Sequence, residues 1–137
     1  MDDLLERLQQ RDWRLTPQRR AVVDALAGAN VHLSADEVLA GVRKALPDTS
    51  RATVYNTLNE LVEMGEVGEL HVAGRSRRYD PNVTNRHHHV LCEACGLVQD
   101  VHLDAGETPS VPASIPGFEL HRVDMLFSGR CRDCAAS

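Results

Sequence analysis

The sequence has few aromatic residues, no long apolar run and no excess of positive charge. Aromatic side chains make up 4% of the 137 residues, so the chain is poorly equipped to stack on the bases of single-stranded nucleic acid. No stretch approaches the roughly 18 consecutive apolar residues that a membrane helix needs, and the acidic N-terminus is unlike an export signal. We therefore expect a cytoplasmic protein with no membrane partner.

The formal net charge of −5 argues against a protein whose whole surface binds nucleic acid. All but four of the 15 lysine and arginine residues, however, lie within the first 80 positions. Any contact with DNA must therefore come from a local basic patch in this half of the chain.

The first 80 residues carry helix patterns with clear start and stop signals. Thr16 before a proline, Ser34 with Glu37 three residues later, and Ser50 are N-cap signals. Apolar spacing and these caps predict helices over residues 2–11, 16–28, 34–46 and 50–64. A hairpin that turns near residues 73–76 and ends at Asp80 follows.

Helices followed by a basic hairpin are typical of a winged helix-turn-helix, with residues 50–64 as the helix that enters the major groove. Its outward side carries hydroxyl, amide and guanidinium groups, which contact phosphates and base edges of double-stranded DNA. The alternative is a helix face that is merely solvated. The predicted DNA contacts are Arg14, Gln18, Arg19, Ser50, Arg51, Thr53, Tyr55, Asn56 and Arg77.

Four cysteines form two C-x-x-C pairs, Cys92 with Cys95 and Cys131 with Cys134. Two such pairs suit one tetrahedral zinc ion, and we predict a structural Zn²⁺ site. Two disulfides or four unrelated buried thiols are the alternatives.

A second metal site is predicted from histidine and aspartate residues. His87 and His89 are two residues apart, so on a strand both rings point the same way, and Asp80 and Asp100 lie near the same sheet. His32 is the distant candidate. Three imidazoles and two carboxylates suit Fe²⁺ or Mn²⁺ better than structural zinc, although zinc, cobalt and nickel stay open. The alternative is a solvated histidine cluster.

The expected fold class is α+β. It comprises a winged-helix DNA-binding domain at residues 1–80, a hinge at 81–86, and a small metal-binding α/β dimerisation domain at 87–137, stapled by the zinc site. Strands are expected over residues 97–103 and 118–131. Any helix in the proline-rich segment 109–116 should be short.

Four motifs together resemble the ferric uptake regulator family. The resemblance implies a homodimeric winged-helix repressor, not an enzyme and without a small organic substrate, whose metal-loaded form binds operator DNA. The motifs are Arg14-Leu15-Thr16-Pro17-Gln18-Arg19, Ala52-Thr53-Val54-Tyr55-Asn56-Thr57-Leu58, His87-x-His89-x-x-Cys92-x-x-Cys95-Gly96 and Gly129-x-Cys131-x-x-Cys134.

Within the family the chain is most similar to the peroxide-responsive branch. Asn56 stands where iron-sensing members usually have arginine, and Asp80 and Asp100 stand where those members usually have glutamate. The resemblance implies that His32, Asp80, His87, His89 and Asp100 bind a regulatory Fe²⁺ or Mn²⁺. It also implies that iron-catalysed oxidation by hydrogen peroxide converts His32 or His87 to 2-oxo-histidine. The operator DNA of oxidative-stress genes of the catalase type is then released.

Other functions remain as alternatives. The chain could be an iron- or zinc-responsive repressor of metal uptake, or could sense peroxide through oxidation of its four-cysteine site. A metal-dependent hydrolase built on His87, His89 and Asp100 lacks an identifiable substrate-binding element in the sequence. A zinc-storage or adaptor protein would use the winged helix to bind protein instead of DNA.

Overall fold

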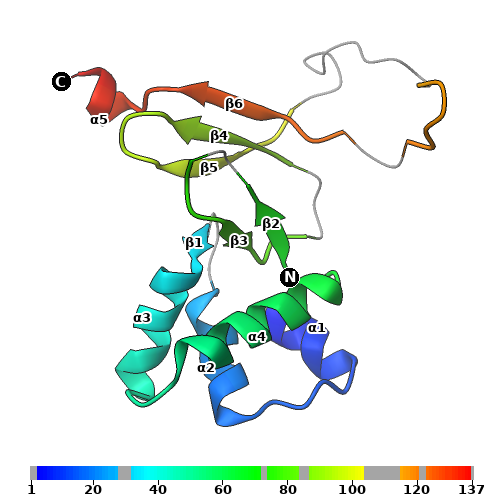
Figure 1. The fold of residues 1–137 in the computed structure, drawn as a ribbon, viewed down its shortest axis with the longest axis vertical. Helices are drawn as coiled ribbons and strands as arrows, with labels where there is room; N and C mark the ends of the chain where they lie inside the picture. The colour runs from blue at the N-terminus through cyan, green and yellow to red at the C-terminus, as the bar shows by residue number, and fades with distance from the viewer. Residues whose placement is uncertain are drawn as a thin grey trace. The chain divides into compact units, whose positions relative to one another are not determined.

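The computed structural model divides into two compact units, Met1–Asn85 and Arg86–Ser137 (Figure 1). The residues that it describes are 3–27, 32–71, 74–83, 87–103, 115–120 and 123–136. Several predicted features therefore lie outside the described residues: the end of the second helix at Gly28, residue 73 of the predicted hairpin turn, hinge residues 84–86, and 109–114 of the proline-rich segment.

The helical unit contains the four predicted helices. They are α1 (Leu4–Gln10), α2 (Pro17–Ala25), α3 (Ala35–Ala45) and α4 (Arg51–Glu63). The predicted caps are present, because the side chains of Thr16, Ser34 and Ser50 each accept a hydrogen bond from the backbone three residues on. Ser34 and Glu37 form the full capping box.

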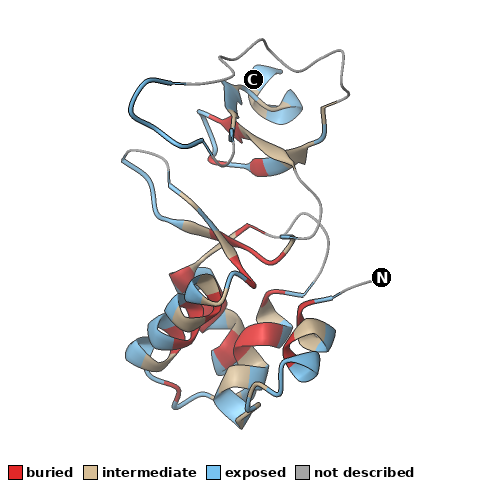
Figure 2. Cartoon of the chain, turned by 90° about the vertical axis from the view of Figure 1, so that its right-hand side faces the viewer, coloured by how far each residue is buried: buried red, intermediate tan, exposed pale blue. Residues whose placement is uncertain are grey.

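The apolar stripes of these helices meet in one core. Ten large side chains among the described residues are essentially inaccessible to solvent, and each fully buried side chain of this size contributes about 1.5–3 kcal/mol of transfer free energy. Figure 2 shows buried residues as red segments of the helices and of the sheet beside them. The ten are Leu8, Val22, Leu26, Val38, Val42, Val54, Leu58, Leu61, Val67 and Tyr79.

A three-stranded antiparallel sheet completes this unit. Its strands β1 (Leu33–Ser34), β2 (Gly68–Leu70) and β3 (Arg78–Asp80) lie in the order β1-β3-β2. The predicted hairpin is confirmed by β2 and β3, which pair from Gly68 opposite Asp80 to Leu70 opposite Arg78. Helices followed by this hairpin form the predicted winged helix-turn-helix.

In its described residues, the second unit is a small sheet followed by one helical turn. Strands β4 (His88–Cys92), β5 (Val98–Val101) and β6 (Leu126–Gly129) lie in the order β5-β4-β6, and α5 (Arg132–Ala135) follows. β4 pairs antiparallel with β5 and parallel with β6. Leu91, Cys92 and Val98 are its buried apolar residues among those described, so the core of this sheet is small.

One strand prediction was wrong in extent. Among the described residues, the strand predicted over 118–131 is formed only at Leu126–Gly129, and Phe118, its expected first residue, belongs to a tight turn. The Phe118 N–H donates to the Ile115 carbonyl at 3.0 Å, and Gly117 between them has a φ of 84°. Glycine adopts this left-handed conformation without a steric cost, so the chain reverses just before the point where the strand was expected to continue.

No helix in the described parts of the chain has the length and apolar character to span a membrane.

Candidate metal centres and DNA-binding face

His32 and Asp80 face each other in the helical unit. Extending the antiparallel register of β1 and β3 by one residue places His32 opposite Asp80. His32 Nε2 lies 3.4 Å from Asp80 Oδ2. Both side chains are buried, with 2% and 7% exposed. Arg78 donates to the His32 carbonyl at 3.2 Å, and the Asn82 N–H donates to Asp80 Oδ1 at 2.8 Å. The pair thus presents one imidazole and one carboxylate from fixed backbone.

His87, His89 and Asp100 converge in the second unit. β4 and β5 pair so that His89 stands opposite Asp100. His87 lies two residues before His89, so its side chain points to the same side of the extended chain. Asp100 Oδ1 lies 3.3 Å from His87 Nε2 and 3.7 Å from His89 Nε2. The Asp100 side chain is 5% exposed and the His87 side chain 7%. A buried carboxylate between two imidazoles is a ligand arrangement typical of a divalent cation.

Two unassigned histidines of this sheet differ from these ligands. One ring nitrogen of His88 is already engaged in a hydrogen bond, since its Nδ1 accepts from the Met125 N–H at 3.0 Å. His102 is exposed, and its ring centroid lies 5.8 Å from that of His87. His121 lies outside the described residues.

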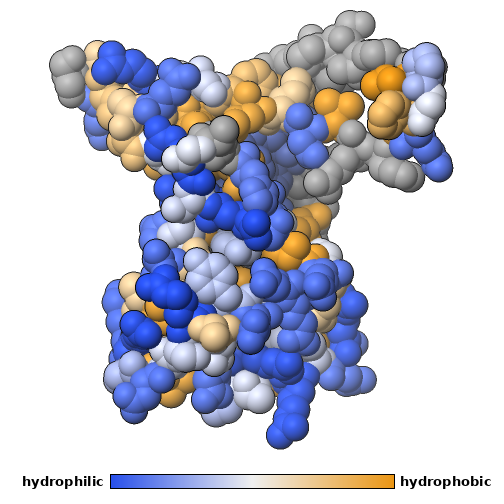
Figure 3. All heavy atoms as spheres, viewed as in Figure 1, coloured by the Kyte–Doolittle hydropathy of each residue, from blue (hydrophilic) through white to orange (hydrophobic). Residues whose placement is uncertain are grey.

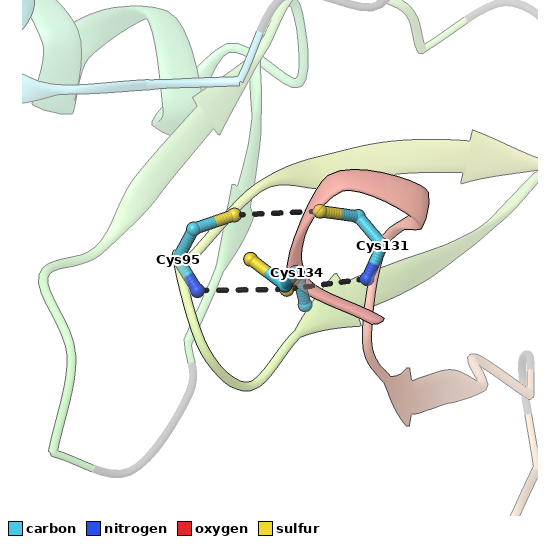
Figure 4. A group of neighbouring side chains, drawn as sticks. Cys95, Cys131 and Cys134 are labelled. Atoms are coloured by element: carbon cyan, nitrogen blue, oxygen red, sulfur yellow. Dashed lines mark hydrogen bonds between the residues drawn. The ribbon is translucent and has the colours of Figure 1, made fainter. Parts of the chain in front are cut away.

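The four cysteines form one cluster, as predicted. Their sulfur atoms lie within 4.8 Å of one another, and Cys95 Sγ is 3.8 Å from Cys131 Sγ. Figure 4 shows the sulfurs of Cys95, Cys131 and Cys134 turned toward one another. Four thiolates on one zinc ion at about 2.3 Å lie about 3.8 Å apart, so the cluster has the dimensions of a tetrahedral zinc site.

The thiols of this cluster do not ionise alike. The Cys131 and Cys95 N–H groups donate to Cys92 Sγ at 3.3 and 3.5 Å and lower the pKa of Cys92 to about 6. The neighbouring thiols of Cys131, Cys92 and Cys95 raise the pKa of Cys134 to about 12. A divalent cation would remove this asymmetry, because it stabilises every thiolate that it binds.

The predicted DNA contacts lie around the start of α4 and the adjoining elements. Arg14, Gln18, Ser50, Arg51, Tyr55, Asn56 and Arg77 are exposed, whereas Thr53 and Arg19 are partly buried. A hollow of about 250 Å³ lies between α2 and α4, lined by Thr16, Gln18, Arg19, Thr53, Asn56, Thr57 and Glu60. The face of the helical unit in Figure 3 is mainly hydrophilic.

Several of these side chains already have protein partners. Arg19 donates to Glu60 Oε2 at 2.9 Å and stacks over Trp13, with its guanidinium 4.6 Å from the ring centroid. Arg51 pairs with Asp36, and this hydrogen bond and charge raise the pKa of Arg51. Sequence reasoning missed the acidic partners Glu60 and Asp36, because periodicity within one helix does not reveal a pair across two helices.

The comparisons with known proteins agree with this architecture. The model of the ferric uptake regulator family matches residues 10–128. The chain is 38% identical over 136 residues to the transcriptional regulator FurA of Mycobacterium tuberculosis, covering 98% of this chain and 92% of that protein. It is 34% identical over 136 residues to the peroxide operon regulator of Bacillus subtilis, covering 98% and 93%.

The fold agrees with a solved structure over the whole chain. The ferric uptake regulator Fur of Helicobacter pylori superposes with a TM-score of 0.74 at 23% identity, covering 100% of this chain and 99% of that one. The α+β class and the winged-helix architecture are thereby confirmed. The chain belongs to the ferric uptake regulator family, whose members are metal-responsive, dimeric, DNA-binding transcription regulators and not enzymes.

Proposed function

We propose that this regulator is a repressor that senses hydrogen peroxide through a bound metal ion. Its regulatory ligands are His32, Asp80, His87, His89 and Asp100, and its regulatory ion is Fe²⁺ or Mn²⁺. The observation that carries the proposal is that buried imidazoles lie beside buried carboxylates. His32 Nε2 is 3.4 Å from Asp80 Oδ2, and His87 Nε2 is 3.3 Å from Asp100 Oδ1. Three nitrogen and two oxygen donors, none of them a thiol, suit these ions.

The metal is proposed to act through the two units. His32 and Asp80 belong to the winged-helix domain, proposed as residues 1–80, whereas the other three ligands belong to the domain proposed as residues 87–137. One ion shared by both sets would restrain the hinge at 81–86. The restrained form would present the α4 helices of a homodimer to two operator half-sites.

We propose that Zn²⁺ occupies the four-cysteine cluster and has a structural role. The 3.8 Å separation of Cys95 and Cys131 Sγ matches the spacing expected around zinc. The sheet beside it has few buried apolar side chains, so metal binding would supply part of its folding free energy.

Peroxide sensing would take place at the regulatory ligands. Bound Fe²⁺ would supply the redox chemistry that activates hydrogen peroxide. His32 and His87 would hold the ion, and their rings would be the groups that gain an oxygen atom. One peroxide oxygen becomes the C2 oxygen of 2-oxo-histidine, and the other leaves as water. The altered ring is a poorer ligand, so the hinge is released and operator DNA of catalase-type genes dissociates in the cytoplasm.

The dimer is proposed to form through the second unit. β6 is an edge strand of the described sheet, and its Leu126 and Phe127 are each 39% exposed, while Phe118 is 73% exposed. An apolar edge strand of this kind is normally covered, and a second copy would cover it.

A second candidate is oxidation at the cysteines. The pKa of about 6 for Cys92 favours its thiolate, which is the reactive form, yet Cys92 is 4% exposed. Regulation by metal alone, without peroxide sensing, is a third candidate, since one relative is named FurA and another a peroxide operon regulator.

One experiment separates these candidates. Protein loaded with zinc and either Fe²⁺ or Mn²⁺ is treated with hydrogen peroxide, and operator binding, peptide masses and free thiols are followed together. We expect loss of DNA binding and one added oxygen on a peptide containing His32 or His87 in the Fe²⁺ form, with little change in the Mn²⁺ form. Cysteine oxidation that precedes DNA release would instead favour the thiol mechanism. Metal-dependent DNA binding that peroxide leaves intact would favour metal sensing alone.

A further inference from the structure

Arg7 connects the first helix to the residue that follows Asp80. Its Nε donates to Glu66 Oε2 at 2.7 Å, and its Nη2 donates to the carbonyls of Glu66 at 3.1 Å and Pro81 at 2.9 Å. The side chains of Arg7 and Glu66 are 13% and 11% exposed. The guanidinium is therefore held in a nearly solvent-free position, with the Pro81 carbonyl as one of its acceptors.

The backbone around Asp80 needs such support because the β-ladder ends there. Asp80 is the last residue of β3 and stands opposite Gly68, the first residue of β2. Beyond it, the Asn82 N–H bonds back to Asp80 Oδ1 at 2.8 Å, which closes a tight turn over Pro81. The Pro81 carbonyl and the Asn82 N–H belong to one planar peptide group, so holding this carbonyl orients the N–H that donates to Asp80 Oδ1.

We propose that Arg7 is a positioning residue for the Asp80 carboxylate and so raises the affinity of the regulatory site for its metal. The proposal rests on the proposed function, in which Asp80 is a ligand. Groups that hold a ligand in place change metal affinity by about 10- to 100-fold when they are removed. Arg7 acts on the peptide group between Pro81 and Asn82 and not on the carboxylate itself. We therefore expect a loss of metal affinity at the lower end of this range, about tenfold.

Arg11 provides a matched control on the same helix. Its Nη1 donates to Glu66 Oε1 at 2.9 Å and to the Met64 carbonyl at 2.9 Å. Arg11 therefore shares the Glu66 carboxylate with Arg7, but its bonds end at Glu66 and Met64, before the turn that carries Asp80. A change at Arg11 disturbs the same ion pair without releasing the Pro81 carbonyl.

The test measures Mn²⁺ binding to full-length protein that retains its zinc, by electron paramagnetic resonance of the free ion. The variants are Arg7→Gln, Arg7→Lys, Arg11→Gln, Asp80→Asn, and Arg7→Gln combined with Asp80→Asn. Circular dichroism and zinc content report whether each variant is folded. We expect a roughly tenfold rise in Kd for Arg7→Gln, a smaller rise for Arg7→Lys, and no change for Arg11→Gln.

The double variant tests whether Arg7 acts through Asp80. If it does, adding Arg7→Gln to Asp80→Asn weakens Mn²⁺ binding no further, because the losses of coupled residues do not add. Should Arg7→Gln fail to fold, Arg7→Lys is read in its place, alone and with Asp80→Asn.

Each remaining outcome overturns a defined claim. Unchanged Mn²⁺ affinity in both Arg7 variants, or an equal loss in Arg11→Gln, refutes the positioning role while Asp80→Asn still weakens binding. A fully additive double variant also refutes it. If Asp80→Asn leaves the affinity unchanged, the regulatory site as proposed is wrong, and the role of Arg7 is overturned with it.

Discussion

Glu66 gives a quantitative test of the ion pairs that join α1 to the end of α4. Its carboxylate accepts from Arg7 at 2.7 Å and from Arg11 at 2.9 Å, with its own side chain 11% exposed. Burial alone would raise the pKa of Glu66, but the hydrogen bonds and charges of the two arginines outweigh burial and hold the pKa below its ordinary value of 4.5. The ionised carboxylate therefore stabilises the folded state.

The perturbation is Glu66→Gln, which keeps the shape and removes the charge. A hydrogen bond between charged groups contributes about 1.5–3 kcal/mol, and the bond to Arg7, whose side chain is 13% exposed, should lie in this range. The Arg11 side chain is 46% exposed, so solvent screening reduces the contribution of the Arg11–Glu66 ion pair to stability to about 0–1 kcal/mol. Since glutamine can still accept one neutral hydrogen bond, we expect the variant to lose about 2 kcal/mol of unfolding free energy near pH 7.

The sign of the pH dependence follows from the lowered pKa. The stabilisation is fully present above the unfolded pKa of about 4.5 and is lost as the pH falls through the lower folded value. Protonated glutamic acid resembles glutamine, so the difference between the two proteins should shrink on acidification below pH 4.5.

The assay is urea unfolding at several pH values, followed by the fluorescence of Trp13. It is the single tryptophan of the chain, and its Nε1 donates to Glu60 at 2.9 Å, so it reports on the helical unit. A difference below about 0.5 kcal/mol at pH 7, typical of a surface pair, would show that the Arg7–Glu66 bond is weaker than its burial implies. A difference that stays constant as the pH is lowered would contradict the predicted pH dependence.

The remaining predictions concern zinc and DNA. Cys134→Ser should lose zinc, measured as metal content after gel filtration, and should loosen the second unit while the tryptophan-detected unfolding is unchanged. At pH 8, zinc binding to the metal-free thiols should release the proton of Cys134, whose pKa is raised to about 12, but hardly that of Cys92, whose pKa is about 6. Proton release in weak buffer should therefore be below four per zinc. Arg51→Ala should weaken operator and non-specific DNA alike and reduce the salt slope by about 0.9. Asn56→Ala should cost about 1–3 kcal/mol on the operator only.

Local chemistry made the helical unit predictable from sequence. A helix begins where a side chain can accept a backbone N–H, and Thr16, Ser34 and Ser50 each do so three residues upstream of the donor. The C-x-x-C spacing is equally local, since each pair brings two sulfurs to one turn. In both cases the interacting atoms are separated by a few residues.

Features that depend on distant residues were not readable in the same way. Arg7 and Glu66 are 59 residues apart, and Arg19 and Glu60 are 41 residues apart, so neither pair produces a recognisable spacing in the sequence. The predicted phosphate contact Arg19 is consequently also a bridge to Glu60. The predicted start of the last strand at Phe118 was wrong, because Gly117 permits a turn that ends at Phe118.

The most direct test of the central claim is the binding of Mn²⁺ to zinc-loaded protein when ligands are removed from one unit at a time. We predict one Mn²⁺ per chain in the unaltered protein and at least tenfold weaker binding in both His32→Ala and His89→Ala, with zinc retained. Metal-dependent binding of operator DNA should fall in parallel. Unchanged Mn²⁺ affinity in His32→Ala would contradict the claim, because the ion would then be held by the second unit alone.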